Sequence, residues 1–416
     1  MANACGVDFG TSNSTVGWSR PGEPALLPLE DGKVTLPSVV FFNAEEDEVS
    51  FGRAALADYL SGYEGRLMRS MKSLLGTDLM DSQTEVMGRA VPFRDLLAFF
   101  IAELKRRAEV AADGEFDCAV FGRPVFFVDD NDDADVLAED TLEDIAREVG
   151  FKEVAFQFEP IAAAFDYESQ ITREELVLIA DIGGGTSDFS LVRLSPSRIQ
   201  QVDRRTDILA NGGVHIGGTD FDKYLSLVSA MPLLGLGSRL INDSEVPSSY
   251  YYNLATWHTI NLVYTQKVAR QLQDVYREAR ERDKLDRLRQ LIEQRDGHWL
   301  AMKVEEGKIA LSDAPNVALH LERFTNGETL ALTRDGFDGA ISHLVTGVEK
   351  TVATLLQDAG ISADQVDTVF FTGGSSGVQL LRQRIAALLP NAKRIEGDLF
   401  GSIGNGLAID AVRKFG

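Results

Sequence analysis

Short apolar runs alternate with turn-forming residues along the first fifty positions of the chain. The runs are Gly17 to Arg20, Ala25 to Leu29, Pro37 to Phe42 and Glu48 to Phe51, and Pro-Gly, Asp-Gly and acidic turns separate them. Short apolar runs between such turns are typical of strands joined in a meander. A sheet is therefore predicted to open the chain.

The period of the apolar positions changes further along. Apolar residues recur at helical spacing from Phe93 to Ala112 and again from Ala138 to Val149. Between these segments, Cys118 to Phe127 is a largely apolar run that is typical of a buried strand. Because helices and buried strands alternate, the pattern predicts an α/β fold.

A second pair of strands repeats the layout of the first pair. A glycine-containing turn separates Glu175 to Asp181 from Phe189 to Leu194, as another separates Cys5 to Asp8 from Thr15 to Trp18. The chain is therefore interpreted as two related halves, each of which opens on a hairpin.

One long segment, Val263 to Asp296, is dense in Arg, Glu, Gln and Asp. Its apolar residues fall on one stripe, which is the spacing of an amphipathic helix; they are Val268, Leu272, Val275 and Ala279. We expect this helix to pack on its own lobe, and a surface for a partner is the alternative.

Composition narrows the function classes. The 416 residues are 44% hydrophobic and 25% charged, which is enough apolar material for two or more domain-sized cores. With 64 acidic and 41 basic side chains the net charge is −23, which disfavours binding to nucleic acid or to an anionic membrane surface. Two cysteines form no disulfide framework, and no apolar run approaches the ~18 residues of a membrane span. We expect a cytoplasmic protein.

The first hairpin carries candidate chemistry. At residues 7–14, VDFGTSNS, an apolar strand ends on Asp8, and Gly10, Thr11 and Ser12 follow before the chain turns back. Glycine lets backbone N–H groups approach an anion, hydroxyl groups add donors, and a carboxylate at a strand end can hold Mg²⁺ through its water shell. Taken alone, the segment is equally compatible with an ordinary Asp/Gly turn.

The same design recurs at residues 180–188, ADIGGGTSD, again between two apolar strands. Two such loops argue for phosphate binding far more than one does. Asp8 and Asp181 are therefore expected to face each other across a cleft that holds a metal–phosphate complex. Three glycines in a turn can also serve only to relieve strain, but the flanking pair Asp181 and Asp188 disfavours that alternative.

Other common site types lack their motifs. There is no G-x-x-x-x-G-K-[ST] run and no G-x-G-x-x-G that opens a helix, which excludes the P-loop and dinucleotide-binding classes. No H-E-x-x-H segment occurs, and the five histidines have no cysteine partner at the spacing of a metal site.

Five segments in order carry a family resemblance: the two loops, Phe158 to Ala164 (FEPIAAA), Gly212 to Asp222 (GGVHIGGTDFD) and Val369 to Ser375 (VFFTGGS). The loops resemble the phosphate motifs of the actin, sugar kinase and heat-shock chaperone superfamily. The other three resemble segments of the seventy-kilodalton heat-shock chaperones, the Hsp70 family, and the match covers nearly the whole chain. The resemblance implies an actin-like ATPase fold of two lobes, each built on a mixed β-sheet with flanking helices, with a nucleotide cleft between them.

The resemblance also implies roles for matching residues. Asp8 and Asp181 would bind hydrated Mg²⁺, and Lys72 would stabilise charge on the γ-phosphoryl group of ATP. Glu159 and Asp188 would position water and metal, and either would accept a proton. The catalytic set is thus Lys72, Glu159, Asp181 and Asp188, and the residues expected to bind ATP or ADP are Gly10, Thr11, Ser12, Asn13, Gly183, Gly184, Gly185, Thr186, Gly217, Gly218, Glu305, Lys308, Ser312, Gly373, Gly374 and Ser375.

Structural alternatives stand beside these roles. Lys72 is otherwise one more surface lysine. Glu159, followed by a proline, is otherwise a helix-start signal. Pro124 falls where the family has a proline linked to interdomain signalling, but the arginine expected after it is replaced by the acidic run Asp129 to Asp135, which puts the switch role in doubt.

The adenosine site departs from the family pattern. The family grips adenosine with a Glu-x-x-Lys-Arg-x-x-Ser helix and a Gly-Gly-Ser-x-Arg loop, whose arginines lie over the adenine faces. Glu305, Lys308 and Ser312 match the helix, but Ile309 and Gly377 stand at the two arginine positions. Weaker ATP binding and weaker discrimination against GTP are expected.

The resemblance implies lobe I at residues 1–172, lobe II at 173–398 with a helical subdomain at about 219–304, and a closing helix at 399–416. No segment resembles the peptide-binding domain, as in the truncated YegD-type members. Two functions remain open: a slow ATPase whose lobe closure acts on an unknown protein partner, and a nucleotide-gated scaffold with little hydrolysis. Lys72 with its carboxylates favours the ATPase; a sugar kinase or filament-forming actin relative is a weaker third reading.

Overall fold

A computed structural model of the chain describes residues 3–128, 131–324, 327, 329–398 and 401–416. Asp129 and Asp130 of the predicted acidic run, and positions 399 and 400 of the predicted closing segment, lie outside the described residues. The chain divides into two compact units. The first comprises Met1–Gly213, Thr351–Ser376 and Ala386–Gly416, and the second comprises Val214–Lys350 and Gly377–Ile385.

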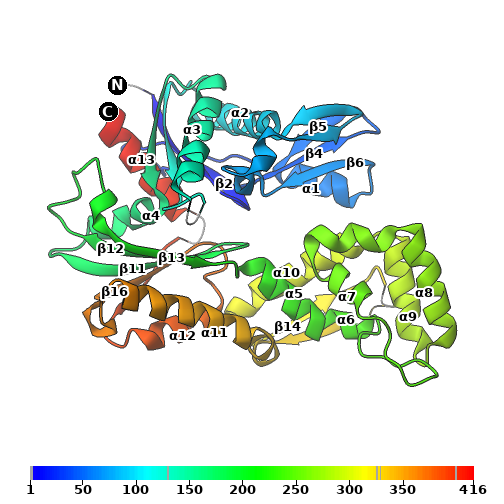
Figure 1. Cartoon of the computed structure of the whole chain (residues 1–416). Coiled ribbons are helices and arrows are strands. Elements are labelled where there is room, and N and C mark those ends of the chain that lie inside the picture. The colour runs from blue at the N-terminus through cyan, green and yellow to red at the C-terminus, as the bar shows by residue number, and fades with distance from the viewer. Residues whose placement is uncertain (1–2, 129–130, 325–326, 328, 399–400) are drawn as a thin grey trace. The chain divides into compact units, whose positions relative to one another are not determined.

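Two five-stranded sheets with the same internal pattern form the centre of the first unit (Figure 1). In each, a central strand pairs antiparallel with the strand that follows it and parallel with a later one. The first sheet has the order β10 (Glu153–Phe158), β9 (Cys118–Arg123), β1 (Ala4–Phe9), β2 (Asn13–Gly17) and β3 (Leu36–Pro37). The second has the order β17 (Lys393–Glu396), β16 (Thr368–Thr372), β11 (Glu175–Ile182), β12 (Ser187–Leu194) and β13 (Ile208–Val214). The predicted repeat of two halves and the α/β class are confirmed.

Helices and smaller sheets surround the first sheet. The small sheets contain β4 (Val39–Asn43), β5 (Glu48–Phe51) and β6 (Gly65–Arg69), and β7 (Gln83–Val86) and β8 (Arg89–Pro92). The helices are α1 (Gly52–Leu60), α2 (Phe93–Ala112), α3 (Asp132–Glu148) and α4 (Glu159–Glu168), with short 3₁₀ turns η1 (Met71–Leu74) and η2 (Asp78–Asp81). The buried stripe of α2 and the apolar faces of β1 and β9 belong to one hydrophobic core.

The C-terminal helix α13 (Ser402–Phe415) packs against both β1 and α4, as the red helix in Figure 1 shows. Small residues allow this contact. A Cβ atom added at Gly406 would lie 1.8 Å from the carbonyl oxygen of Ala162 in α4, and one at Gly6 would lie 2.3 Å from the backbone of Leu407. The two backbones therefore approach more closely than any side chain at these glycines would permit.

The second unit is mainly helical. Its elements are α5 (Gly218–Val228), α6 (Ala230–Leu233), α7 (Ser249–Leu254), η4 (Trp257–Tyr264), α8 (Gln266–Glu278), α9 (Arg282–Glu293), α10 (Gly297–Asp313) and the hairpin β14 (Asn316–His320) with β15 (Thr329–Thr333). Two helices, α11 (Arg334–Asp358) and α12 (Gln379–Leu388), have residues in both units. The short turns η3 (Arg205–Asp207) and η5 (Ala363–Gln365) belong to the first unit.

Several sequence predictions are wrong in detail. Only Gly17 of the run Gly17 to Arg20 lies in a strand, and the strand predicted at Cys118 to Phe127 ends at Arg123. The segment Val263 to Asp296 is not one helix, because Ala279 is extended and bridges Leu240, and this pairing separates α8 from α9. The run Ala25 to Leu29 is not a regular strand. Its backbone pairs with the end of β2 through a single bridge, and its other backbone hydrogen bonds are isolated ones.

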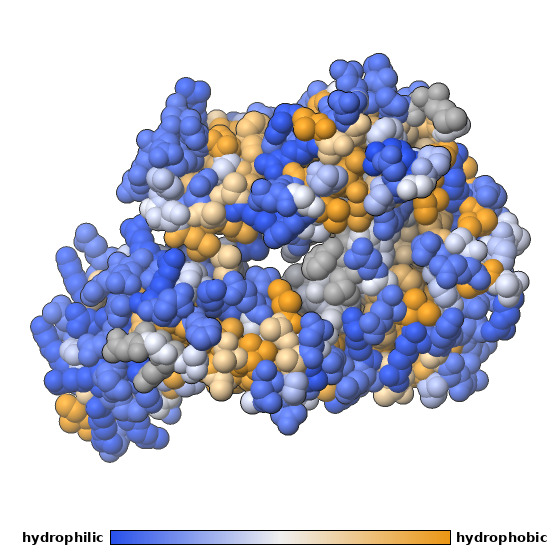
Figure 2. Space-filling model, turned by 180° about the vertical axis from the view of Figure 1, so that it is seen from behind, coloured by the Kyte–Doolittle hydropathy of each residue, from blue (hydrophilic) through white to orange (hydrophobic). Residues whose placement is uncertain are grey.

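The surface is largely polar. The face in Figure 2 is dominated by hydrophilic residues, among which apolar residues form separate patches. No helix in the described part of the chain has the length and apolar character that a membrane crossing requires.

Candidate functional site

The loop of the first hairpin is held in one shape by its own backbone and by Ser38. A Cβ atom at Gly10 would lie 2.2 Å from the carbonyl oxygen of Asn13, so only glycine fits. Ser38 donates its hydroxyl to the carbonyl of Gly10 at 2.6 Å and its N–H to the carbonyl of Ser12 at 2.9 Å. The partly exposed hydroxyl and amide side chains of residues 11–13 stand on this fixed loop.

The loop of the second hairpin lies against the first. A Cβ atom at Gly184 would lie 2.4 Å from the hydroxyl oxygen of Ser12, so the glycine allows the two loops to approach. Gly183 donates its N–H to the carbonyl of Thr186 at 2.9 Å, which closes the turn. Gly185 is exposed, and a Cβ atom there would meet nothing within 4 Å.

A buried ion pair stands close to both hairpins. Lys72 of η1 donates to Glu159, the first residue of α4, with 2.5 Å between Nζ and Oε1. Burial alone would lower the pKa of Lys72, but the charges of Glu159 and Asp8 outweigh it and raise that pKa. The lysine therefore stays protonated beside the carboxylates.

The two aspartates at the strand ends carry strongly shifted acidities. Burial, and then the charge of Glu159, raise the pKa of Asp8 to about 7, against the opposing charge of Lys72. Burial, and then the charges of Asp188, Glu159 and Asp8, raise the pKa of Asp181 to about 8. A cation bound here would relieve this accumulation of negative charge.

Magnesium fits this donor set through a partial water shell. Asp8 and Asp181 supply the oxygen ligands that Mg²⁺ prefers. Across the described residues, no three Asp, Glu, His or Cys side chains converge as a closed metal cage requires. A magnesium ion here would thus keep several waters or take phosphate oxygens, as it does in most nucleotide sites.

The glycine loop after β16 packs on the second hairpin. Gly373 has a φ of 83°, and a Cβ atom there would lie 2.3 Å from Oδ1 of Asp181. Ser375 donates its N–H to the carbonyl of Ile182 at 2.9 Å, and Gly374 is exposed. These contacts place residues 373–375 beside the end of β11.

The remaining predicted residues belong to the second unit. Gly217 is the N-cap of α5, which begins at Gly218, and its N–H donates to Asp220 at 3.1 Å. On α10, Lys308 is buried and pairs with Asp222 at 2.9 Å. Within the same unit Glu305 is exposed and Ile309 is 56% exposed, and a Cβ atom at Gly377 would lie 3.3 Å from Oγ of Ser312.

Sequence reasoning missed three residues that shape the site. Ser38 fixes the first loop. A Cβ atom added at Gly122 would lie 3.2 Å from Cγ of Glu159, and one added at Gly213 would lie 2.7 Å from Oδ1 of Asp188, so both glycines lie against site carboxylates. Gly213 was visible in the GGVHIGGTDFD segment, but the other two had no motif signal.

The chain matches the family described as Hsp70 protein over residues 4–95, 81–230 and 270–406. The chain belongs to the Hsp70 family. This membership, together with the paired mixed sheets, confirms the predicted resemblance and the actin-like ATPase fold. Residues 231–269, which include most of α6 and all of α7 and η4, lie outside the matched ranges.

Similar Hsp70 proteins are named chaperones. The chain is 27% identical to "Chaperone protein HscA" of Citrobacter koseri, 30% to "Chaperone protein HscA homolog" of Shewanella putrefaciens and 27% to "Chaperone protein DnaK" of Thermosipho melanesiensis. Each alignment covers 98% of this chain and 58% of the relative, so the chain spans little more than half the length of these proteins.

Proposed function

We propose that this Hsp70-family chain binds ATP with Mg²⁺ and hydrolyses it slowly. One observation carries the proposal: two aspartate–glycine hairpins from two related sheets lie against each other beside the buried Lys72–Glu159 pair. Glycine loops that expose backbone N–H groups suit phosphate oxygens, and the aspartates suit a hydrated cation. The family assignment supports adenine nucleotide as the ligand.

The residues of the chain have distinct tasks in this proposal. A bound Mg²⁺ would neutralise phosphate charge. Lys72, held by Glu159, stabilises the charge that develops on the transferred γ-phosphoryl group. Glu159 and Asp188 orient the attacking water; the second receives a hydrogen bond from Thr186 at 2.8 Å. Comparison of Glu159→Gln with Asp188→Asn in single-turnover hydrolysis identifies the proton acceptor, because the larger loss marks that residue.

We further propose that nucleotide-driven lobe closure acts on a protein partner, since the relatives are named chaperones. The partner is a protein rather than nucleic acid or membrane, in keeping with the net charge of −23. Both cysteines are buried and unpaired, which suits the cytoplasm. Affinity capture in ATP and in ADP would test this part, because a partner that closure controls is retained in only one of them.

A nucleotide-gated scaffold with little hydrolysis is the second candidate. The observation in its favour is the closed Lys72–Glu159 pair, in which the lysine already has a carboxylate partner at 2.5 Å. Single-turnover measurements separate the two functions: the ATPase releases phosphate from bound ATP within minutes, whereas the scaffold keeps its ATP intact.

Calorimetry tests the binding site itself. ATP should bind in Mg²⁺ and bind far more weakly in EDTA, and Asp181→Asn should weaken binding in Mg²⁺ more than it does in EDTA. Asp313→Asn, an exposed acidic residue at the end of α10, serves as the matched control. Equal ATP affinity with and without Mg²⁺ would contradict the proposed metal role.

A further inference from the structure

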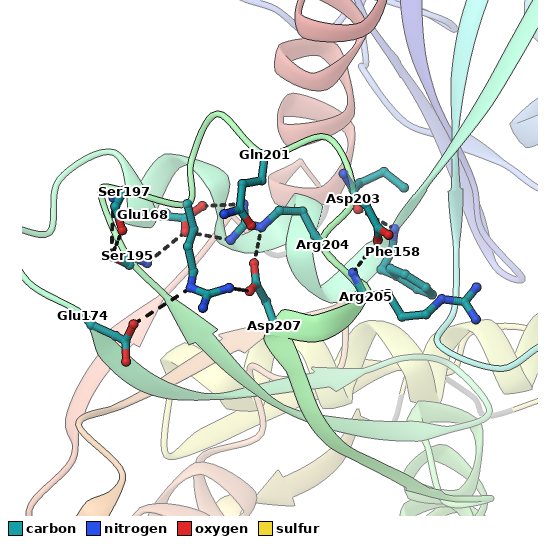
Figure 3. Close-up of polar contacts among 12 residues, drawn as sticks. Phe158, Glu168, Glu174, Ser195, Ser197, Gln201, Asp203, Arg204, Arg205 and Asp207 are labelled. Atoms are coloured by element: carbon teal, nitrogen blue, oxygen red, sulfur yellow. Dashed lines mark hydrogen bonds and ion pairs between the residues drawn. The ribbon is translucent and has the colours of Figure 1, made fainter.

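Two consecutive arginines contact the two ends of α4. Arg204 is buried, and its guanidinium donates to Glu168, the last residue of α4, at 2.7 and 2.9 Å. Arg205 lies over the ring of Phe158, the residue before α4, with 5.7 Å between its guanidinium carbon and the ring centroid. Figure 3 shows both contacts. Because a helix of this length spans about 15 Å, one Arg-Arg pair reaches both of its ends.

The loop that carries the arginines, residues 195–207 between β12 and β13, is itself fixed. Asp207 is fully buried and accepts hydrogen bonds from Arg204 and Arg198. Glu168 also accepts the N–H of Ser195 at 3.0 Å. Each buried charge has partners, and breaking such a pair leaves an uncompensated charge. The backbone on which the second arginine stands is thus tied to the C-terminal end of α4.

Arg205 differs from the other arginine at the same ring. Arg123 also lies over Phe158, at 5.3 Å, but it is buried and donates to Asp135 at 2.7 Å and to the carbonyl of Pro124 at 3.1 Å. Arg205 is exposed, and its guanidinium forms no ion pair within the described part of the chain. Arg123 is thus fixed beside the ring by its own hydrogen bonds. The guanidinium of Arg205, in contrast, is held there mainly by its contact with the ring.

The ring belongs to the residue at the start of α4. Phe158 occupies the N-cap position, and no side-chain hydrogen bond caps the helix. The next residue, Glu159, lies against Gly122 and pairs with Lys72. A shift of the Phe158 ring therefore moves the carboxylate that holds the lysine.

We infer that Arg205 is a positioning residue for Glu159, which it acts on through the ring of Phe158. The inference rests on the proposed ATP hydrolysis at Lys72 and Glu159. Cation–π contacts at exposed sites are worth about 0.5–1 kcal/mol, so loss of this one should lower kcat about two- to fivefold. Affinity for Mg-ATP should stay within about twofold, because Arg205 does not touch the phosphate loops.

Single-turnover hydrolysis and calorimetry with Arg205→Ala, Arg205→Lys, Phe158→Leu and the double variant Arg205→Ala/Phe158→Leu form the test. We expect lower kcat with unchanged affinity in Arg205→Ala, recovery in Arg205→Lys, and no further loss in the double variant compared with Phe158→Leu. Arg173→Ala is the control, since Arg173 is an exposed arginine of the same unit in a surface ion pair with Asp367.

The outcomes distinguish the positioning role of Arg205 from the proposed ATPase activity. Parental kcat in Arg205→Ala, or additive losses in the double variant, would overturn the positioning role while the proposed ATPase stands. A parent chain that binds Mg-ATP without hydrolysing it would overturn the ATPase itself, and the positioning role with it. Thermal unfolding of each variant separates these results from loss of fold, and Phe158→Tyr, which keeps the ring, should retain parental kcat.

Discussion

The two hairpin loops occupy equivalent places in two related sheets, yet their surroundings differ. The loop around Gly10 is pinned by its own backbone and by two hydrogen bonds from Ser38. In the loop around Gly185, Gly183 donates its N–H to Thr186 and Thr186 donates its hydroxyl to Asp188, and a Cβ atom at the exposed Gly185 would meet nothing within 4 Å. Gly10 is thus required by the fold of its loop, whereas no packing contact requires glycine at position 185.

The two glycines therefore differ in whether packing explains them. A glycine forced by a backbone contact is explained without any ligand. Gly185 has open space around it and no left-handed backbone conformation, so neither packing nor φ explains it, and the close approach of phosphate is the reason proposed here.

The charge of Lys72 acts on an aspartate of each hairpin, because it lowers the pKa of Asp8 and of Asp181 against the larger effects that raise them. Lys72→Ala should lower single-turnover hydrolysis by about 10²–10³-fold, the usual cost of removing a preorganised charge from a transition state. Binding of Mg-ATP should change only a few fold, because the loops carry it. Lys152→Ala, an exposed lysine paired with Asp117, is the control. Parental hydrolysis in Lys72→Ala would remove Lys72 from the catalytic set.

If the two hairpins supply most of the free energy of ATP binding, the adenine base contributes little to it. The resemblance predicts that the exposed Ile309 stands where the family has an arginine over adenine. If so, Ile309→Arg should raise ATP affinity by about two- to thirtyfold, equivalent to one cation–π contact of ~0.5–2 kcal/mol. Ile309→Gln is the matched control without charge. Competition calorimetry with GTP measures selectivity, and a hundredfold preference for ATP in the parent would contradict this account.

Alanine at the two loop glycines tests the comparison directly. Gly10→Ala should destabilise the fold by about 1–3 kcal/mol, because its Cβ meets the Asn13 carbonyl. Gly185→Ala should leave stability within about 1 kcal/mol, since its Cβ has room, but should weaken Mg-ATP binding. Denaturant unfolding and calorimetry measure the two effects. Unchanged affinity in Gly185→Ala would show that this loop does not approach the ligand.

The aspartates give a pH dependence of stability in the absence of metal. Both pKa values are raised by folding, so their contribution is fully present at low pH and is lost as the pH rises through about 7 for Asp8 and about 8 for Asp181. In EDTA, the melting temperature should therefore fall from about pH 4 and level off above about pH 8. Asp181→Asn should flatten this slope more than Asp8→Asn, and equal slopes would contradict the ranking of the two sites.

Sequence patterns located the elements better than the contacts between them. The helix Phe93 to Ala112 was predicted to the residue, because its apolar stripe keeps one period until Asp113 adopts a left-handed conformation. The long segment at 263–296 was wrong, because its break depends on a bridge to Leu240, which lies far away in the sequence. A local sequence pattern does not predict a contact with a residue that comes near only when the chain folds.

The same limit applied to the site. The motif residues of both hairpins were found from strand ends and glycines, and the assigned roles of these residues stay predictions. The contact of Ser12 with Gly184, the Lys72–Glu159 pair and the wall formed by Gly122 join residues that are distant in the sequence. No spacing rule reports them, since each depends on how the two sheets meet.

The packing of α13 on β1 also bears on how the chain is made. The strand β1 is synthesised long before the helix α13 that covers it. The second unit is nearly continuous in sequence, so it can complete its fold on the ribosome while the first unit waits. Contacts of such long sequence separation slow folding. Until α13 arrives, β1 and α4 expose apolar surface, and this is the interval in which the new chain is most prone to aggregate.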